Sequence, residues 1–160
     1  MNNIIIRPKT NSDHKILENF MTLHWGGEPL IVHGKKYFTK DLEGYLGFDG
    51  NECIAFLLFE RQQIDWEIIV FESFSKFSGI GTKLLNALFD EAKKNNCPQI
   101  HVMTTNDNLD ALRFYQRRGF VLSGIFLDVV EYARSLKPSI PALGDYDIPI
   151  RDELMLVYKF

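Results

Sequence analysis

The amphipathic pattern of residues 80–95 is the feature that most restricts the fold of this chain. Its apolar side chains recur at helical spacing, with Lys, Asp and Glu on the opposite side, which predicts a helix with one buried face. Short apolar segments at residues 64–71 and 99–104 flank it and predict strands. The apolar positions of the predicted helix are Ile80, Leu84, Leu85, Leu88, Phe89 and Ala92.

The other segments add hairpins and more helices to this unit. Two strands joined by the short link 62–63 predict an antiparallel hairpin, whereas residues 30–45 are ambiguous and residues 138–149, with three prolines, read as a loop. This mixture predicts a single α/β (mixed α+β) domain of residues 1–160, with helices on both faces of the sheet. The remaining expected strands are 4–6, 53–60, 120–126 and 151–160, and the remaining expected helices are 13–24, 108–118 and 129–136.

Composition excludes several classes of function. The chain carries 18 Lys and Arg against 21 Asp and Glu, so it has no electrostatic basis for binding nucleic acid, and Arg113, Arg117 and Arg118 read as solvated surface charges. Its longest apolar run is too short to cross a membrane. Cys53 and Cys97 have no paired spacing, which predicts reduced thiols, no metal site and a cytoplasmic location. Homodimerisation is left open.

A glycine-containing turn precedes the predicted helix. Gly79 and Gly81 allow the backbone to turn sharply, and the unpaired N–H groups at the helix start favour an anion such as pyrophosphate. The pattern alone is also typical of an ordinary loop. A third glycine of the dinucleotide fingerprint is missing, because Leu84 stands there, and no Gly-Lys-Ser/Thr ending of a P-loop is present.

Residues 76–82 resemble the acyl-CoA loop of the GNAT superfamily of N-acetyltransferases, Arg/Gln-x-x-Gly-x-Gly/Ala, with Lys76 as the departure. Residues 108–120 are similar to the family's second motif, Asn-x-x-Ala-x-x-x-Tyr-x-x-x-Gly-Phe, at the family spacing. The resemblance implies acetyl-CoA as cosubstrate and a mostly antiparallel sheet that is splayed at the CoA site. Its implied CoA-binding residues are Lys76, Phe77, Ser78, Gly79, Ile80, Gly81, Thr82, Asn108, Ala111 and Phe114.

The resemblance also implies that the strand before the loop separates from its parallel neighbour and uses its backbone to hold the pantetheine arm. By position these backbone groups belong to Ile69, Val70 and Phe71. A β-bulge would open the sheet there. Alternation along the strand predicts that Ile64, Trp66, Ile68 and Val70 share one face, and that Asp65, Glu67, Ile69 and Phe71 share the other.

Acyl transfer from a thioester to an amine needs an acid for the leaving thiolate and a base for the amine. Tyr115 falls on the family's acid position, and a tyrosine keeps its proton at working pH. Asn108 would either contact pantetheine or cap a helix. Glu67 is the preferred base, with Asp65 or a water as alternatives, and burial would raise its pKa. The histidines are no better placed.

The acceptor is expected to lie against the parts of the chain that no motif covers: Trp25, Tyr37, Phe38 and the loop 138–149. The leading hypothesis is an N-acetyltransferase that moves the acetyl group of acetyl-CoA directly to a primary amine of a small molecule in a ternary complex. The alternatives are transfer to a protein or peptide amine, and a catalytically silent CoA-binding sensor module. Fold-level analogy does not name the amine.

Overall fold

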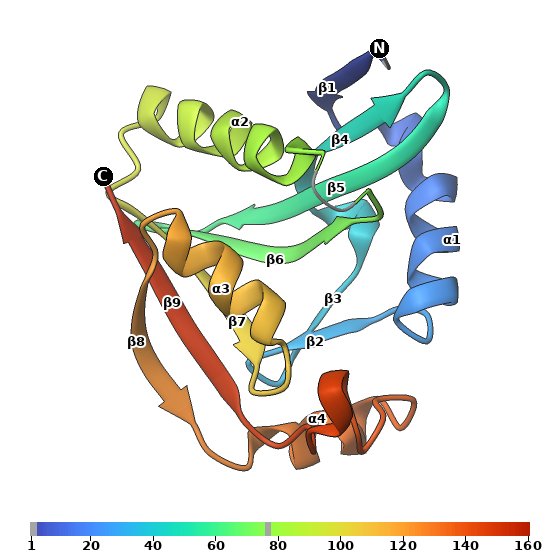
Figure 1. The fold of residues 1–160 in the computed structure, drawn as a ribbon, viewed down its shortest axis with the longest axis vertical. Coiled ribbons are helices and arrows are strands. Elements are labelled where there is room, and N and C mark those ends of the chain that lie inside the picture. Colours follow the sequence, from blue (N-terminus) through green and yellow to red (C-terminus); the bar gives the residue numbers. More distant parts are fainter. Residues whose placement is uncertain (1–2, 76–77) are drawn as a thin grey trace.

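The computed structural model describes residues 3–75 and 78–160, and this part of the chain forms one seven-stranded sheet with helices packed on it (Figure 1). The strand order is β1-β4-β5-β6-β7-β9-β8, and every neighbouring pair is antiparallel except β6 and β7. This arrangement confirms the predicted fold class. The strands are β1 Ile4–Pro8, β2 Leu30–Val32, β3 Lys35–Tyr37, β4 Glu43–Asp49, β5 Glu52–Arg61, β6 Trp66–Ser73, β7 Gln99–Thr105, β8 Val121–Phe126 and β9 Glu153–Lys159.

The helices pack on both faces of the sheet and separate its apolar side chains into two cores. One core lies under α2 and α3 and contains Leu84, Leu88 and Tyr115, and the other lies under α1 and the β2–β3 hairpin and contains Leu17 and Met21. The helices are α1 His14–His24, α2 Ile80–Lys94, α3 Leu109–Arg117 and α4 Val129–Leu136, with 3-10 turns η1 Asn11–Asp13, η2 Thr39–Asp41 and η3 Asp145–Asp147.

The predicted apolar stripe of α2 forms the centre of the first core. Ile80, Leu84, Leu85 and Leu88 are each at most 1% exposed. Close packing of this kind makes each such side chain worth about 2–5 kcal/mol of stability against truncation to alanine. None of the helices in the described parts of the chain is long and apolar enough to span a membrane.

The ambiguous residues 30–45 form a small hairpin and the start of a central strand. His33 (φ 54°) and Gly34 (φ 71°) form the two-residue turn between β2 and β3, and successive positive φ values are typical of a type I′ hairpin. β4 then begins at Glu43 and pairs with both β1 and β5. The expected loop 138–149 also contains one short element, η3.

The sheet opens between β6 and β7, as the family resemblance implied. The two strands pair only through Trp66–Ile100, Glu67–His101 and Ile68–Val102. On the other side of β6, the register with β5 shifts because Leu58 pairs with Val70 while Phe59 pairs with Ile68. Ile69 is therefore the extra residue of a β-bulge, which bends a strand away from its neighbour.

The bulge makes the prediction of unbroken alternation along this strand wrong. Ile68 packs in the core under α2, but Ile69 and Val70 both pack in the core under α1, and Phe71 returns to the α2 side. The extra residue shifts the period of two by one position. Every β6 side chain after Ile69 thus faces the side opposite to the one that the sequence predicted. Ile64, expected on the strand, lies before it and is 74% exposed.

Candidate active site

A cleft of about 140 Å³ occupies the space between the diverging ends of β6 and β7. Ile69, Val70 and Phe71 line it, and their backbone groups on the β7 side are outside the β6–β7 ladder. A ligand in the cleft can therefore use main-chain groups that a neighbouring strand would otherwise occupy. The remaining lining residues are Trp25, Ile31, Val32, Ile68, Glu72, Val102, Met103, Thr104, Thr105, Asn108, Ala111, Tyr115 and Glu153.

Tyr115 enters the cleft from α3 and is 5% exposed. Its ring packs against Phe71, Phe114 and Phe120, at centroid distances of 6.3, 5.4 and 5.1 Å. Burial raises the pKa of the phenol, and the negative charge of Glu72 adds to this effect. Within the described residues the hydroxyl has no hydrogen-bond partner, so it is a protonated donor that is free to act on a ligand.

Glu72 lines the same cleft and is a residue that the sequence analysis did not single out. The indole Nε1–H of Trp25 donates to its Oε1 at 3.1 Å. Burial raises the pKa of the Glu72 carboxyl; the Trp25 hydrogen bond opposes this effect, and the charge of Asp145 adds to it. A second carboxyl, Glu153, also lines the cleft with a pKa that burial raises.

Glu67 lies outside the residues that line the cleft and is tightly paired. It is 1% exposed, and its two oxygens lie 2.6 Å from His33 Nε2 and 3.5 Å from His101 Nε2. The Gln62 amide also donates to Oε2 at 2.9 Å. Atoms of His33, Glu67 and His101 lie within 4.8 Å of one another, so within the described residues this is the group that could hold a cation.

The expectation that burial would raise the pKa of Glu67 is wrong. Burial acts in that direction, but the hydrogen bonds and positive charges of His101 and His33 outweigh it and lower the pKa to about 2. The histidines that the sequence analysis set aside thus hold this carboxylate. No sequence signal brings them together, because His33 lies in the β2–β3 turn and His101 in β7.

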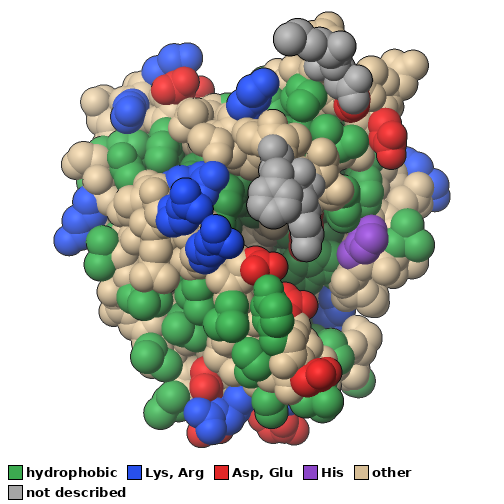
Figure 2. Space-filling model, in the orientation of Figure 1, with side chains coloured by type: hydrophobic (Ala, Val, Ile, Leu, Met, Phe, Trp, Pro, Cys, Tyr) green, Lys and Arg blue, Asp and Glu red, His purple; other side chains and the backbone are tan. Residues whose placement is uncertain are grey.

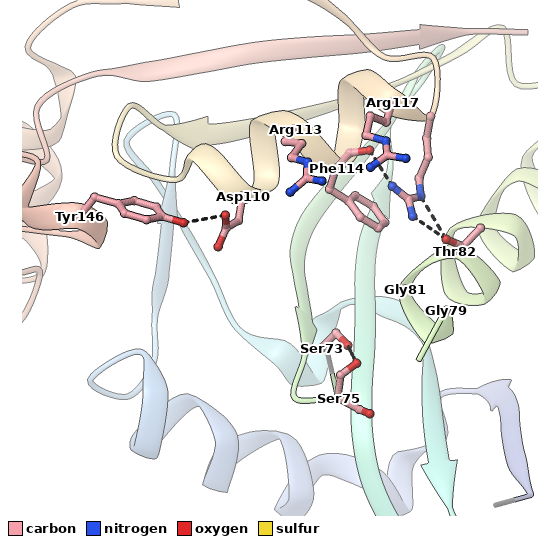
Figure 3. Close-up of a pocket in the computed structure, with 11 residues that line it drawn as sticks. Ser73, Ser75, Gly79, Gly81, Thr82, Asp110, Arg113, Phe114, Arg117 and Tyr146 are labelled. Atoms are coloured by element: carbon pink, nitrogen blue, oxygen red, sulfur yellow. Dashed lines mark hydrogen bonds between the residues drawn. The ribbon is translucent and has the colours of Figure 1, made fainter. Parts of the chain in front are cut away.

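A larger cavity of about 550 Å³ lies between the start of α2 and one side of α3 (Figure 3). Gly79 is the N-cap of α2 and has a left-handed backbone (φ 75°), a conformation that glycine adopts without strain. The first N–H groups of a helix have no intrahelical partner and favour an anion. The cavity is lined by Ser73, Ser75, Gly79, Gly81, Thr82, Asp110, Arg113, Phe114, Arg117, Arg118 and Tyr146.

Three arginines of α3 and its C-cap contribute to this cavity, so the sequence interpretation of Arg113, Arg117 and Arg118 as solvated charges is incomplete. The Arg118 guanidinium donates to Thr82 Oγ1 and lies 3.7 Å from the centroid of the Phe114 ring. Burial lowers the pKa of Arg118, as does the neighbouring Arg117. Figure 2 shows basic side chains gathered above acidic ones at the middle of this face.

The other motif residues have local roles that suit these two cavities. Asn108 caps α3 by accepting a hydrogen bond from Ala111 N at 3.1 Å, and both residues line the cleft. Gly81 packs against the Phe114 ring, which a Cβ atom would approach to 3.2 Å. Ser78 Oγ donates to Ser75 O and accepts a weak bond from Ile80 N. The predicted contacts of Lys76 and Phe77 lie outside the described residues.

Comparison with known proteins agrees with this geometry. The family model described as "Acetyltransferase (GNAT) family" matches residues 14–120. The chain belongs to the GNAT acetyltransferase family. GNAT enzymes use acetyl-CoA as their cosubstrate. In this member residues of both family motifs line the larger cavity, whereas the second motif alone contributes to the cleft, through Asn108, Ala111 and Tyr115.

One relative by sequence is the protein described as "Uncharacterized protein YxbD" of Bacillus subtilis (strain 168). It is 38% identical over 153 residues, which cover 95% of this chain and 96% of the relative. Two solved structures share the fold. The structure described as "IAA acetyltransferase" from Bacillus cereus ATCC 14579 has a TM-score of 0.74 and 18% identity, and the match covers 99% of this chain and 100% of that one. A GNAT acetyltransferase from Elizabethkingia anophelis with acetyl-CoA bound has a TM-score of 0.70, 19% identity, and full coverage of both chains.

Only some of the residues that were expected to bind the acceptor line the cleft. Trp25 lines it, but Tyr37 is buried in the core under α1 and donates to Glu60, and Phe38 lies outside the lining residues. The loop 138–149 contributes Tyr146 to the larger cavity, where its hydroxyl donates to Asp110 at 2.8 Å. That loop therefore fastens to the start of α3.

Proposed function

We propose that this protein transfers the acetyl group of acetyl-CoA directly to a primary amine of a small molecule, within a ternary complex. The observation that carries the proposal is the cleft between β6 and β7, in which unpaired main-chain groups and the Tyr115 hydroxyl meet. Main-chain donors can align a thioester and stabilise its developing oxyanion. The same cleft opens beside carboxyl groups that suit an amine.

The cosubstrate would extend from the larger cavity into the cleft. Its pyrophosphate would lie at the start of α2, next to Gly79 and Gly81, with the arginines of α3 as counter-charges. Its pantetheine arm would follow Ile69, Val70 and Phe71, with Asn108 and Ala111 on the opposite wall. This places the thioester beside Tyr115, whose proton would go to the departing thiolate.

A small amine fits the acceptor side better than a protein substrate. Trp25, Ile31 and Val32 form an apolar wall there, and Glu72 and Glu153 are its acidic groups. A cleft of about 140 Å³ is below the volume of typical pockets for drug-sized ligands, about 300–1,000 Å³. The proposal extends to the whole chain, residues 1–160, as one catalytic unit. It assigns the enzyme to a reducing cytoplasm, where Cys53 and Cys97, both buried and free, remain thiols.

The test is turnover of acetyl-CoA with a panel of primary amines: phenethylamine, tyramine, agmatine, spermidine and a short peptide with a free N-terminus. Thiol release shows turnover, and mass spectrometry shows the acetylated product. Acetylation of a small amine at a higher kcat/KM than of the peptide supports the proposal. Preference for the peptide would assign the chain to protein acetylation. Binding of acetyl-CoA without any product would leave a silent CoA-binding module.

A further inference from the structure

The bulge at Ile69 turns Glu72 toward the acceptor side of the sheet. With unbroken alternation Glu72 would share the face of Trp66 and Ile68, under α2. Instead it is hydrogen-bonded to Trp25, the C-cap of α1, on the opposite face. The same irregularity that separates β6 from β7 thus also directs a carboxyl group into the gap.

Glu72 and Tyr115 reach the gap from opposite faces of the sheet. Tyr115 belongs to the core under α2 and α3, whereas Glu72 contacts the end of α1, yet both line one cleft. Both side chains line the same cleft, and the negative charge of Glu72 raises the pKa of the Tyr115 phenol. A carbonyl group held between them would have an acid on one side and a base on the other.

The surroundings of Glu72 leave its carboxylate available. The neighbours that act on it are the Trp25 indole from α1, Asp145 from η3 and the Tyr115 phenol from α3. Among the described residues no Lys, Arg or His forms an ion pair with it. Burial and the Asp145 charge raise its pKa, which makes a carboxylate a stronger base. An acceptor ammonium group could therefore act as the cationic partner of the Glu72 carboxylate.

Glu67 has the opposite character. Its oxygens are occupied by His33, His101 and Gln62, and its pKa of about 2 makes it a weak proton acceptor. It also lies in the part of β6 that still pairs with β7, before the strands separate. Its contacts tie the β2–β3 hairpin to the sheet, which is a structural role.

We propose that the Glu72 carboxylate is the general base that takes the proton from the acceptor ammonium. This inference rests on the proposed function. The neutral nitrogen then attacks the thioester carbon; the C–N bond forms, the C–S bond breaks, and the thiolate receives the Tyr115 proton. The nitrogen loses two protons in all. One passes through Glu72 to water, and the other restores Tyr115, so the products are the amide, CoA thiol and one released proton.

Glu72→Gln tests the proposal, because glutamine has the same shape and its Oε1 still accepts from Trp25. With the amine of the panel that wild type acetylates, we expect kcat/KM for the amine to fall about 10²–10⁴-fold near neutral pH. The affinity for acetyl-CoA and the melting temperature should be unchanged. The deficit should shrink as the pH approaches the pKa of the amine, because a free amine needs no base. Glu18→Gln, on the exposed side of α1, is the matched control.

Trp25→Phe gives an independent readout. The indole hydrogen bond lowers the pKa of Glu72, so its removal should move the ascending limb of the kcat/KM–pH profile to higher pH. A limb that does not move, a Glu72→Gln deficit that is constant with pH, or wild-type activity in Glu72→Gln would each overturn the assignment. A pH-dependent loss of kcat/KM in Glu67→Gln in place of Glu72→Gln would also overturn the assignment. If wild type acetylates no primary amine, the proposed function itself fails.

Discussion

The Arg118 guanidinium donates two hydrogen bonds to the Thr82 hydroxyl, from Nη2 at 2.7 Å and from Nε at 3.1 Å. Arg118 also donates from Nη1 to the carbonyl of Phe114 at 3.0 Å. It therefore joins the C-terminal end of α3 to the first turn of α2. The Thr82 hydroxyl is the acceptor in both bonds, so its own O–H proton can still donate to an anion at the start of α2.

Arg118→Lys should weaken acetyl-CoA binding by about tenfold or more, although it keeps the charge. A lysine lacks the planar fork that reaches Thr82 from two nitrogens, and hydrogen bonds that involve a charged group are worth about 1.5–3 kcal/mol. Calorimetric titration measures the change, with Lys93→Ala at the other end of α2 as control. Equal affinity in Arg118→Lys would contradict the prediction.

Tyr115→Phe should keep acetyl-CoA affinity and lower turnover by about ten- to ten-thousand-fold, the range that general acids supply. The fold should tolerate the change, because the hydroxyl has no partner among the described residues and the ring remains packed. Steady-state kinetics between pH 6 and 9 measure the effect. Tyr132→Phe, at a tyrosine that is 60% exposed, is the control. Full activity of Tyr115→Phe would remove this residue from the mechanism.

Gly81→Glu should abolish acetyl-CoA binding, because it places an anion at the start of α2, where the pyrophosphate is proposed to lie. Gly81→Ala separates charge from bulk. Its Cβ would approach the Phe114 ring at 3.2 Å, so we expect a smaller loss of affinity as that ring shifts. Calorimetry on both folded variants decides the matter, and a Gly81→Glu protein with wild-type affinity would disprove the proposed phosphate site.

Asp145→Asn should raise the amine KM more than Asp147→Asn does and leave the acetyl-CoA KM unchanged. The negative charge of Asp145 acts on Glu72, and no such effect ties Asp147 to the cleft in the described structure. Removal of the charge should also lower the pKa of Glu72 and move the ascending limb of the pH profile downward. The two single variants serve as controls for each other. If neither amine KM moves, the acidic side chains of this loop have no role in binding the amine.

The His33–Glu67 ion pair should stabilise the fold most between about pH 4.5 and 6.5. The pKa of His33 is raised on folding from 6.5, so its contribution is complete below that value and is lost as the pH rises through the folded pKa. The pKa of Glu67 falls from 4.5 to about 2, so its contribution is present above 4.5 and is lost as the pH falls toward 2.

His33→Gln should therefore lower the free energy of unfolding at pH 6, by about 1 kcal/mol after allowance for solvent around the partly exposed histidine. The loss should shrink by pH 9. Denaturant titrations at both pH values measure it, with His24→Gln as the control, because His24 has no ion-pair partner among the described residues. A loss that is the same at both pH values would show that the imidazole acts by packing and not by charge.

The local sequence pattern was sufficient to predict features that lie within a single helix, strand or turn. The stripe of α2, the glycine turn before it and the spacing from Asn108 to Tyr115 each lie within one continuous segment. The opening between β6 and β7 was implied by the family resemblance. Neither the local pattern nor the resemblance identified Glu72 as a residue of the cleft. The bulge at Ile69 reverses the face of every later residue of β6, and the apolar run Ile68, Ile69 and Val70 does not show at which residue the strand bulges.

Contacts between distant segments account for the other differences. Arg113, Arg117 and Arg118 look like surface charges on α3 until α2 is packed beside them. His33 and Glu67 are 34 positions apart, and their contact depends on a β2–β3 hairpin of three residues in each strand. Such short strands leave no periodic pattern that a sequence analysis can detect.

The seam of three residue pairs between β6 and β7 has one more consequence. It divides the sheet into two antiparallel halves, β1-β4-β5-β6 and β7-β9-β8, which share few main-chain bonds. A pantetheine arm in the gap would form main-chain hydrogen bonds that the two strands do not form with each other. Binding of the ligand would therefore stabilise the folded sheet. The melting temperature of this protein would then rise with the concentration of coenzyme A and its esters, and the lifetime of the protein in a cell would depend on their supply.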